Sequence, residues 1–186
     1  MIQKIRKAGA LGGAVQLPGD KSISHRYAML AAIADGATEI RRFAASQDCH
    51  STLRCLSCLG VQIRQDGETV AILGRGFAGL QPPAVPLDAG NSGTTIRLLS
   101  GILAGHPFES VVGGDQSLSN RPMGRIIQPL HLMGATVESR RGGLPPLKIR
   151  GGNLRAVRYS LPVASAQVKS CVLLAGLYGD GPTAVE

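Results

Sequence analysis

The stretch Leu17-Pro-Gly-Asp-Lys-Ser-Ile-Ser-His-Arg26 decides the fold, because two later segments of the chain open in the same way. These segments are Leu87-Asp-Ala-Gly-Asn-Ser-Gly-Thr-Thr-Ile-Arg97 and Leu161-Pro-Val-Ala-Ser-Ala-Gln-Val-Lys169. Each copy begins with leucine, continues with small and polar residues, and leads into an apolar stretch that is typical of a helix. The three leucines are 70 and 74 residues apart. This spacing indicates an internal structural repeat.

The predicted repeat contains two helices and four strands. In each copy the apolar helix ends at a glycine, which is a common C-terminal signal: Gly36, Gly105 and Gly179. A short strand is expected next, at residues 38–40, 109–112 and 183–185. In the first two copies a second helix and two more strands follow, and the last of these strands covers residues 70–73 and 147–149. The predicted fold class is therefore α/β, built from βαβαββ units.

Two whole units and the front of a third account for the 186 residues. The last residue, Glu186, falls within the first strand after the third apolar helix. A natural domain of two and a half units is the alternative, but it leaves an apolar strand without its own helix and neighbouring strands. We therefore expect the sequence to be part of a longer protein.

The composition predicts a soluble, cytoplasmic, globular protein. Hydrophobic residues make up 44% of the chain and charged residues 17%, which excludes intrinsic disorder. No apolar run reaches the ~18 residues that would span a bilayer. Residues 1–13 lack the apolar core of a signal peptide. We expect no membrane partner.

The charge balance favours an anionic partner. Twenty Lys and Arg residues against twelve Asp and Glu residues give a net charge of +8. Aromatic residues make up only 3% of the chain, which argues against single-stranded nucleic acid, because its binding relies on aromatic stacking. A basic excess can instead concentrate small anionic substrates in a cleft. The charge alone does not decide between these partners.

The four cysteines predict no metal site. Cys55 and Cys58 form a CxxC pair, but neither a second pair nor a histidine pair lies at zinc-ligand spacing. Leucines at helical spacing surround this pair, so both thiols are expected on a helix. Reduced cysteines that pack in a helix are therefore favoured over metal or redox chemistry.

Positive residues near the predicted helix starts point to an anionic ligand. Equivalent helices have equivalent directions, so their N-termini should converge around a pseudo-threefold axis, where their N–H groups attract anions. A cation in a first turn costs roughly 0.3–1 kcal/mol. Nevertheless, the helix starts carry Lys21, Arg26, Arg97 and Lys169. Pro122 favours a further helix start with Arg121 at its N-cap.

Hydroxyl and amide residues near the same helix starts fit this interpretation: Ser22, Ser24, Ser92, Thr94, Thr95, Ser165 and Gln167. Taken singly, each is better explained as a helix cap. Gly90 and Gly93 flank Asn91-Ser92 and allow the backbone to approach a ligand closely. No GxxxxGK[ST] motif occurs, so no nucleotide phosphate loop is predicted.

Four motifs resemble the N-terminal signatures of the 5-enolpyruvylshikimate-3-phosphate synthase family, in the same order. They are Pro18-Gly-Asp-Lys-Ser-Ile-Ser-His-Arg26, Gly90-Asn-Ser-Gly-Thr94, Asn120-Arg-Pro122 and Pro162-Val-Ala-Ser-Ala-Gln167. A relative that acts on UDP-N-acetylglucosamine is an alternative, but it typically carries Lys-Asn where this chain has Lys21-Ser22. A non-catalytic basic binding module is a further alternative.

The resemblance implies an inside-out α/β barrel of two three-unit domains with the active site between them. Residues 18–186 would be the N-terminal, shikimate-3-phosphate-binding domain with an incomplete third repeat. Residues 1–17 would lie near the second, C-terminal domain, which is absent from this sequence. The implied reaction transfers the enolpyruvyl group from phosphoenolpyruvate to shikimate 3-phosphate, in the shikimate pathway to chorismate and the aromatic amino acids. The resemblance implies no metal and no cofactor.

The resemblance also implies site residues. Shikimate 3-phosphate would be bound by Lys21, Ser22, Arg26, Ser165, Ala166 and Gln167, with Ala166 contributing only its backbone. Phosphoenolpyruvate would be bound by Lys21, Asn91, Gly93, Thr94, Arg121 and Gln167, and Lys21 would also act electrostatically in catalysis. Asp48 and Lys169 would not contact the ligands directly but would help to position the residues that do.

The resemblance places the proton-transferring carboxylates in the second domain. His25 and His50 are weak acid–base candidates, and a surface or capping role explains both better. We therefore expect this chain alone not to turn over, and we expect it to pair with the missing domain or with itself at the unfinished third unit. In this family a methyl group at the glycine matching Gly93 excludes the inhibitor glyphosate, so Gly93 predicts sensitivity.

Overall fold

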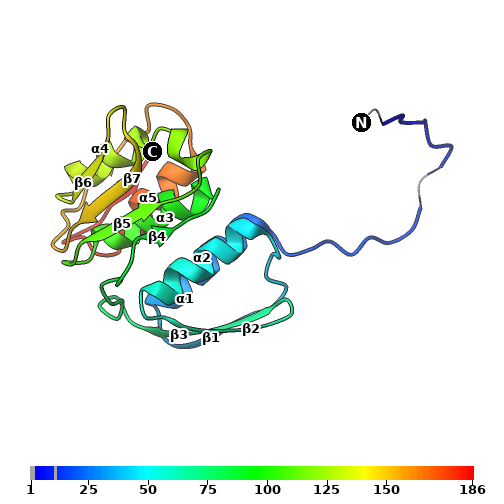
Figure 1. Ribbon diagram of the computed structural model, residues 1–186, viewed down its shortest axis with the longest axis horizontal. Helices are drawn as coiled ribbons and strands as arrows, with labels where there is room; N and C mark the ends of the chain where they lie inside the picture. Colours follow the sequence, from blue (N-terminus) through cyan, green and yellow to red (C-terminus); the bar gives the residue numbers. More distant parts are fainter. Residues whose placement is uncertain (1–2, 11) are drawn as a thin grey trace.

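The structure is a computed structural model that describes residues 3–10 and 12–186. Residues 3–10 and 12–20 form neither helix nor strand, and residues 3–10 and 12–16 extend away from the rest of the molecule (Figure 1). None of the helices in the described ranges is both long and apolar enough to cross a membrane.

The first part of the fold packs two helices against an antiparallel sheet. Its elements follow in the order α1 (Lys21–Ile33), β1 (Asp35–Ile40), α2 (Gln47–Cys58), β2 (Gln62–Asp66) and β3 (Thr69–Arg75). β3 lies between β1 and β2 and pairs antiparallel with both. Val70 and Ile72 are buried whereas Leu73 is exposed, because side chains alternate between the two faces of a strand.

The same order of elements recurs in the second part. It contains β4 (Leu87–Asp88), α3 (Gly93–Ala104), β5 (Ser110–Gly113), α4 (Gly124–Leu132), β6 (Thr136–Arg140) and β7 (Leu144–Arg150). The sheet order is β4-β5-β7-β6. The chain ends with β8 (Arg158–Tyr159), α5 (Ala166–Gly176) and β9 (Ala184–Val185), in which β8 and β9 are parallel. From β4 to β7 the structure has the predicted order βαβαββ.

The prediction of an opening strand in the first copy is wrong for the described residues. β4 and β8 open the later copies by pairing in parallel with β5 and β9. Before α1, no described residue joins a sheet. Pro18 has no N–H to donate to a neighbouring strand. The carbonyl oxygen of Leu17 instead accepts a hydrogen bond from Arg42 Nη2 at 2.5 Å.

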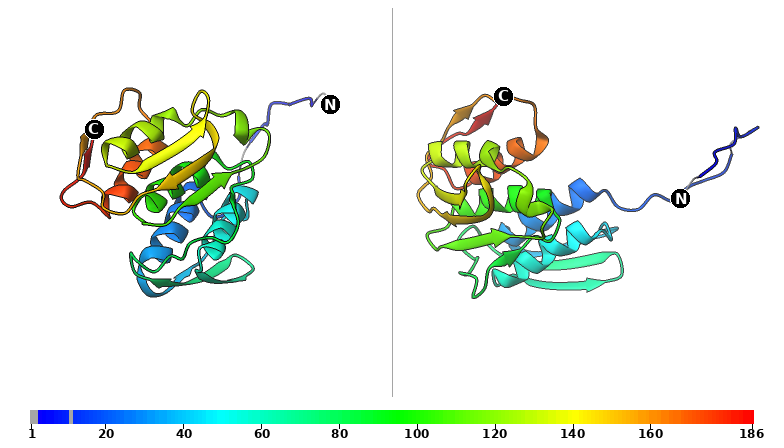
Figure 2. Two further views of the ribbon diagram at one scale, coloured as in Figure 1. Left: turned by 60° about the vertical axis from the view of Figure 1, so that its left-hand side comes forward. Right: turned by 45° about the horizontal axis from the view of Figure 1, so that its top comes forward.

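Helices fill the interior and sheets cover the outside (Figure 2). α3 lies at the centre, since ten of its twelve residues are buried and it contacts all four other helices. The packing of α3 against α5 is the most extensive contact between helices. This arrangement agrees with the inside-out α/β architecture expected from the sequence.

Side-chain caps fix four helix starts, and the predicted cap at Arg121 is wrong. Asp20, Ser46, Ser92 and Ser165 each accept a hydrogen bond from the backbone N–H three residues later. α4 begins only at Gly124, with Met123 at its N-cap. Arg121 instead ends a 3-10 helix, Leu118–Asn120, in the extended conformation that a following proline favours.

Candidate functional site

Side chains near the starts of α1, α3 and α5 come together, as the repeat predicted. The Arg26 guanidinium in α1 donates to Ser170 Oγ in α5 at 2.8 and 3.2 Å. Arg97 Nη1 in α3 donates to Gln167 Oε1 in α5 at 2.8 Å. Gln167 Nε2 in turn donates to Thr94 Oγ1 at 2.9 Å. Side chains from all three copies of the motif therefore meet at one end of the helix layer.

A hollow of about 790 Å³ opens beside this junction. Its polar lining consists of Arg97, Arg121, Arg125, Gln128, Ser165 and Gln167, and no described acidic residue lines it. Burial lowers the pKa of Arg97, and the positive charges of Arg121 and Arg125 lower it further. The hollow is therefore suited to an anion of substantial size.

Arg121 is held in place by a short chain of hydrogen bonds. Its Nη2 donates to Asn91 Oδ1 at 2.6 Å and to Ser117 Oγ at 3.0 Å, and its Nη1 donates to the Asn91 carbonyl at 3.1 Å. Asn91 Nδ2 donates to Asp115 Oδ2 at 2.7 Å. This bond, with smaller help from the Leu118 N–H, lowers the pKa of the Asp115 carboxyl. Asn91 therefore fixes the orientation of the Arg121 guanidinium group through two hydrogen bonds.

Gly93 lets two guanidinium groups approach the start of α3. A Cβ atom at position 93 would lie 2.7 Å from Arg97 Nη1 and 3.5 Å from Arg121 Nη1. Position 93, which the sequence analysis singled out, therefore favours a residue without a Cβ atom. It keeps space next to the charged groups that line the hollow.

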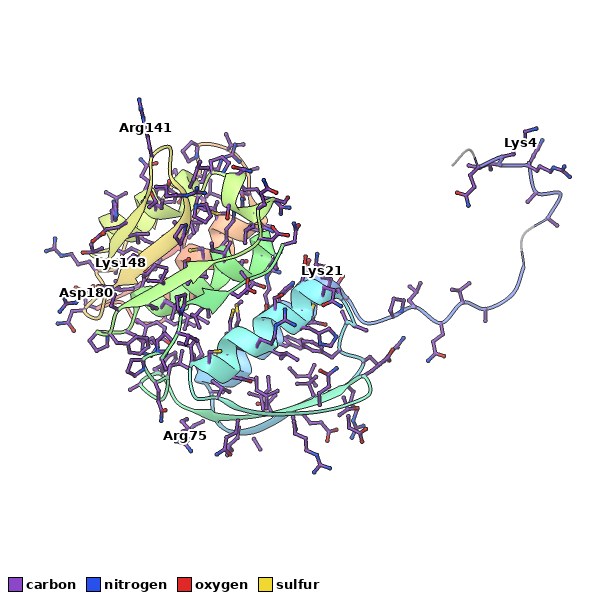
Figure 3. All side chains as sticks on the ribbon, viewed as in Figure 1. Lys4, Lys21, Arg75, Arg141, Lys148 and Asp180 are labelled. Atoms are coloured by element: carbon purple, nitrogen blue, oxygen red, sulfur yellow. The ribbon has the colours of Figure 1, made fainter. Side chains whose placement is uncertain are left out.

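Other sequence-predicted site residues lie outside the lining of this hollow. Lys21, at the exposed start of α1 (Figure 3), forms an ion pair with Asp48. Ser22 is exposed, and its carbonyl oxygen accepts a hydrogen bond from Arg26 Nη1 at 2.9 Å. Lys169 is exposed on α5, and Ala166 is the first residue of that helix. The supporting role expected for Asp48 stays a prediction.

The prediction of a surface or capping role for His25 is wrong. The ring is fully buried, and its Nδ1 lies 2.7 Å from Thr52 Oγ1 in α2. Thr52 Oγ1 lies 2.8 Å from Thr95 Oγ1 in α3, so the three side chains join three helices. His25 precedes the buried Ala28 and Met29 by three and four residues, and this helical spacing is the signal that marks its burial.

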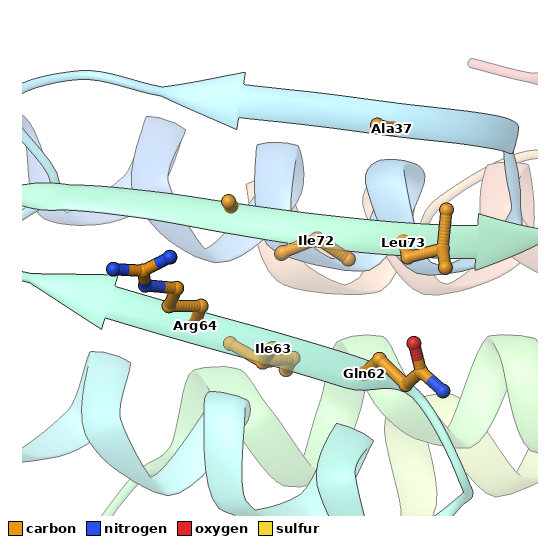
Figure 4. Close-up of a pocket in the computed structure, with 7 residues that line it drawn as sticks. Ala37, Gln62, Ile63, Arg64, Ile72 and Leu73 are labelled. Carbon is orange, nitrogen blue, oxygen red and sulfur yellow. The ribbon is translucent and has the colours of Figure 1, made fainter.

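Two other hollows among the described residues have a different charge pattern: one of about 420 Å³ is lined by Arg41 and Arg42 together with the acidic residues Asp20 and Glu39. The other, of about 250 Å³, lies on the outer face of the sheet β1-β3-β2, where Arg64 is its one charged lining residue (Figure 4). Among the residues that the structure describes, no three His, Cys, Asp or Glu residues gather as a metal site would require. All four cysteines are free, and Cys55 and Cys58 both lie in α2, as predicted.

Comparisons with known proteins identify the family. The model of the family EPSP synthase (3-phosphoshikimate 1-carboxyvinyltransferase) matches residues 5–186. The chain is 55% identical over 185 residues to the 3-phosphoshikimate 1-carboxyvinyltransferase of Solibacter usitatus, covering 100% of this chain and 43% of that protein. It is 58% identical over 185 residues to the protein of the same name from Geobacillus kaustophilus, covering 99% of this chain and 43% of that protein.

A solved structure gives the same result. EPSP synthase from Acinetobacter baumannii superposes with a TM-score of 0.90 at 49% sequence identity, covering 93% of this chain and 40% of that chain. The chain thus spans less than half the length of the relatives it matches. The match extends over nearly all of its residues, so the chain belongs to the EPSP synthase family.

Proposed function

We propose that this chain forms the shikimate-3-phosphate-binding part of an enolpyruvyl transferase and contributes to its phosphoenolpyruvate site. In the reaction, the 5-hydroxyl oxygen of shikimate 3-phosphate loses its proton to a base and adds to C2 of phosphoenolpyruvate, while C3 takes up a proton from an acid. Loss of phosphate from C2 and of a proton from C3 then gives the enol ether. The observation that carries the proposal is the hollow lined by Arg97, Arg121 and Arg125, without a carboxylate among its described lining residues.

Charge and hydrogen bonding support the proposed division of roles. Arg121 and Gly93, with Asn91 and Thr94 beside them, provide a forked cation next to an uncrowded helix start, which suits a carboxylate or phosphate. Ser165 presents a hydroxyl at the start of α5.

Three further residues have roles at this junction. Gln167 links the two sides through its bonds to Arg97 and Thr94. Ser22 and Arg26 are proposed to hold the shikimate carboxylate and hydroxyls.

Lys21 is proposed to act as a compact positive charge. Its ion pair with Asp48 holds it at the start of α1, and a single ammonium can still contact a second anion. Lys169, one turn after Ser165, is proposed to add positive charge behind α5. Both side chains are exposed and therefore available to a ligand or to a further part of a longer protein.

Proton transfer is proposed to depend on groups outside this sequence. General acid–base catalysis needs a titratable group within hydrogen-bond reach of the reacting atom. No Asp, Glu or His lines the hollow among residues 3–10 and 12–186. We therefore assign binding to this chain and propose that the remaining part of a longer enzyme, in the cytoplasm, supplies the acid and base. The free thiols are consistent with a reducing compartment.

The first test separates binding from turnover. Calorimetry with millimolar shikimate 3-phosphate should give a heat of binding for the 186-residue chain, while a product assay should show no turnover. A chimera in which this chain replaces the matching part of the Geobacillus kaustophilus relative should form product. Absence of heat together with an inactive chimera would contradict the proposal. Salt-dependent retention on nucleic acid in place of substrate binding would favour the basic-module alternative.

Gly93 gives a second prediction, for the inhibitor glyphosate. The chimera should be inhibited, and Gly93→Ala should raise the inhibitory concentration about tenfold or more, because the added methyl takes space beside the guanidinium groups where the inhibitor would lie, and about 1.4 kcal/mol of lost binding is a factor of ten. The added methyl displaces Arg97 Nη1 from a position 2.7 Å away. Gly181→Ala is the matched control, since Gly181 does not line the hollow and a Cβ there would make only an ordinary contact, 3.5 Å from Ala156 Cβ. Full activity of the unmodified chimera in millimolar glyphosate would contradict the prediction.

A further inference from the structure

Arg125 is a charged residue of the hollow that the motifs do not explain. It is the second residue of α4, a helix start that has no side-chain cap and no acidic residue in its first turn. Within the described residues its guanidinium has neither an ion-pair nor a hydrogen-bond partner, whereas Gln167 holds Arg97 and Asn91 holds Arg121. A cation at this position opposes the helix dipole.

The surroundings of Arg125 make this position more costly still. Arg97 and Arg121 line the same hollow, and Arg125 is close enough to Arg97 to lower its pKa by charge repulsion. Like charges gathered in a partly buried space raise the free energy of the empty site. An anion bound among these arginines would attract all of them and so lower the free energy of the site. The arrangement is therefore explained by a ligand charge near Arg125.

Ser165 is the one hydroxyl-bearing residue among the described residues that line the hollow. Ser165 and Ala166 begin α5, and only Ser165 carries a side-chain hydroxyl. Arg125 and Gln128 lie one turn apart in α4 and line the hollow together with Ser165. Gln128 adds an amide that can donate to an oxygen atom. With a volume of about 790 Å³, the hollow has room for a phosphorylated ring beside a smaller anion.

We infer that Arg125 binds the phosphate group of shikimate 3-phosphate beside Ser165, and that it supplies the side-chain donors that Ala166 lacks. The inference rests on the proposed function and adds a residue to it. An arginine fork can place two N–H groups on one phosphate, which a serine hydroxyl cannot do. Gln128 supports the same phosphate from the next turn of α4.

The experiment compares shikimate 3-phosphate with shikimate, which lacks only the phosphate. Ligand-detected NMR follows both on the 186-residue chain and its variants. Arg125→Gln should weaken shikimate 3-phosphate about tenfold or more, as expected for charged hydrogen bonds, and leave shikimate within about twofold. Arg125→Lys should lie between. Arg75→Gln removes the same charge at the end of β3, far from α4 (Figure 3), and should change neither affinity.

A second variant tests the compensation directly. Adding Ala166→Ser to Arg125→Gln should restore part of the lost affinity for shikimate 3-phosphate. An Arg125→Gln chain that binds this ligand as well as the unmodified chain overturns the inference and leaves the proposed function standing. An equal loss for both ligands also overturns it, because the phosphate is then not the group that Arg125 recognises. An unmodified chain that binds neither ligand contradicts the proposed function itself.

Discussion

Acidification from pH 6.5 to pH 4 should destabilise the folded chain by about 3 kcal/mol through His25 alone. Burial of the ring lowers its pKa from 6.5 to about 4; the Asp48 carboxylate opposes this shift, and the Lys21 and Arg26 charges add to it. Between these pH values the unfolded chain binds a proton at His25 that the folded chain does not. Stability is therefore fully present above pH 6.5 and is lost as the pH falls toward 4.

Urea unfolding at half-unit pH steps measures this dependence. His25→Asn should reduce the slope by up to about 1.4 kcal/mol per pH unit, since each pKa unit corresponds to that free energy. An asparagine amide can keep the bond to Thr52, so the variant is expected to fold. His106→Asn is the comparison: burial lowers the pKa of His106 too, so this variant should reduce the slope by the contribution of His106 and leave that of His25 in place. An unchanged slope in His25→Asn would contradict the prediction.

The fold was predictable from the sequence where local signals and repetition agree. Apolar stretches that end at glycine located α1, α3 and α5, and the repetition of the pattern located β3 and β7. The prediction of an opening strand in the first copy was wrong, because a strand forms only when a neighbouring strand is available to accept its hydrogen bonds. The sequence of a segment shows its tendency to form a strand, but it does not show whether a neighbouring strand is available to pair with it.

The site was predictable only in part, for a similar reason. Motif residues such as Arg121 and Gln167 have local signatures, and the structure brings them to one hollow. Arg125 and Gln128 have no motif, and they reach the hollow because α4 packs beside α5. The misplaced cap at Arg121 had a different origin. The proline rule holds for many helices, but here a 3-10 helix ends just before Pro122 and α4 starts two residues after it.

Gly101→Ala should have the other large effect on stability, a loss of about 3 kcal/mol. Gly101 lies in the buried middle of α3, where a Cβ would come within 2.2 Å of the Cys171 carbonyl oxygen and 3.0 Å of its carbon in α5. Both atoms belong to the backbone, so no side chain can rotate away. The two helices must move apart, and the buried contacts between them loosen together.

This separation should also disturb the site, because the same two helices carry Arg97 and Gln167, which are bonded at 2.8 Å. We therefore expect Gly101→Ala to lower both the free energy of unfolding, measured in urea, and the affinity for shikimate 3-phosphate. Gly124→Ala is the matched control in α4, where nothing lies within 4 Å, and it should be neutral or stabilising by up to about 1 kcal/mol. Equal stability of the two variants would show that α3 and α5 do not need their close contact at Gly101, and the hollow would then owe its shape to other contacts.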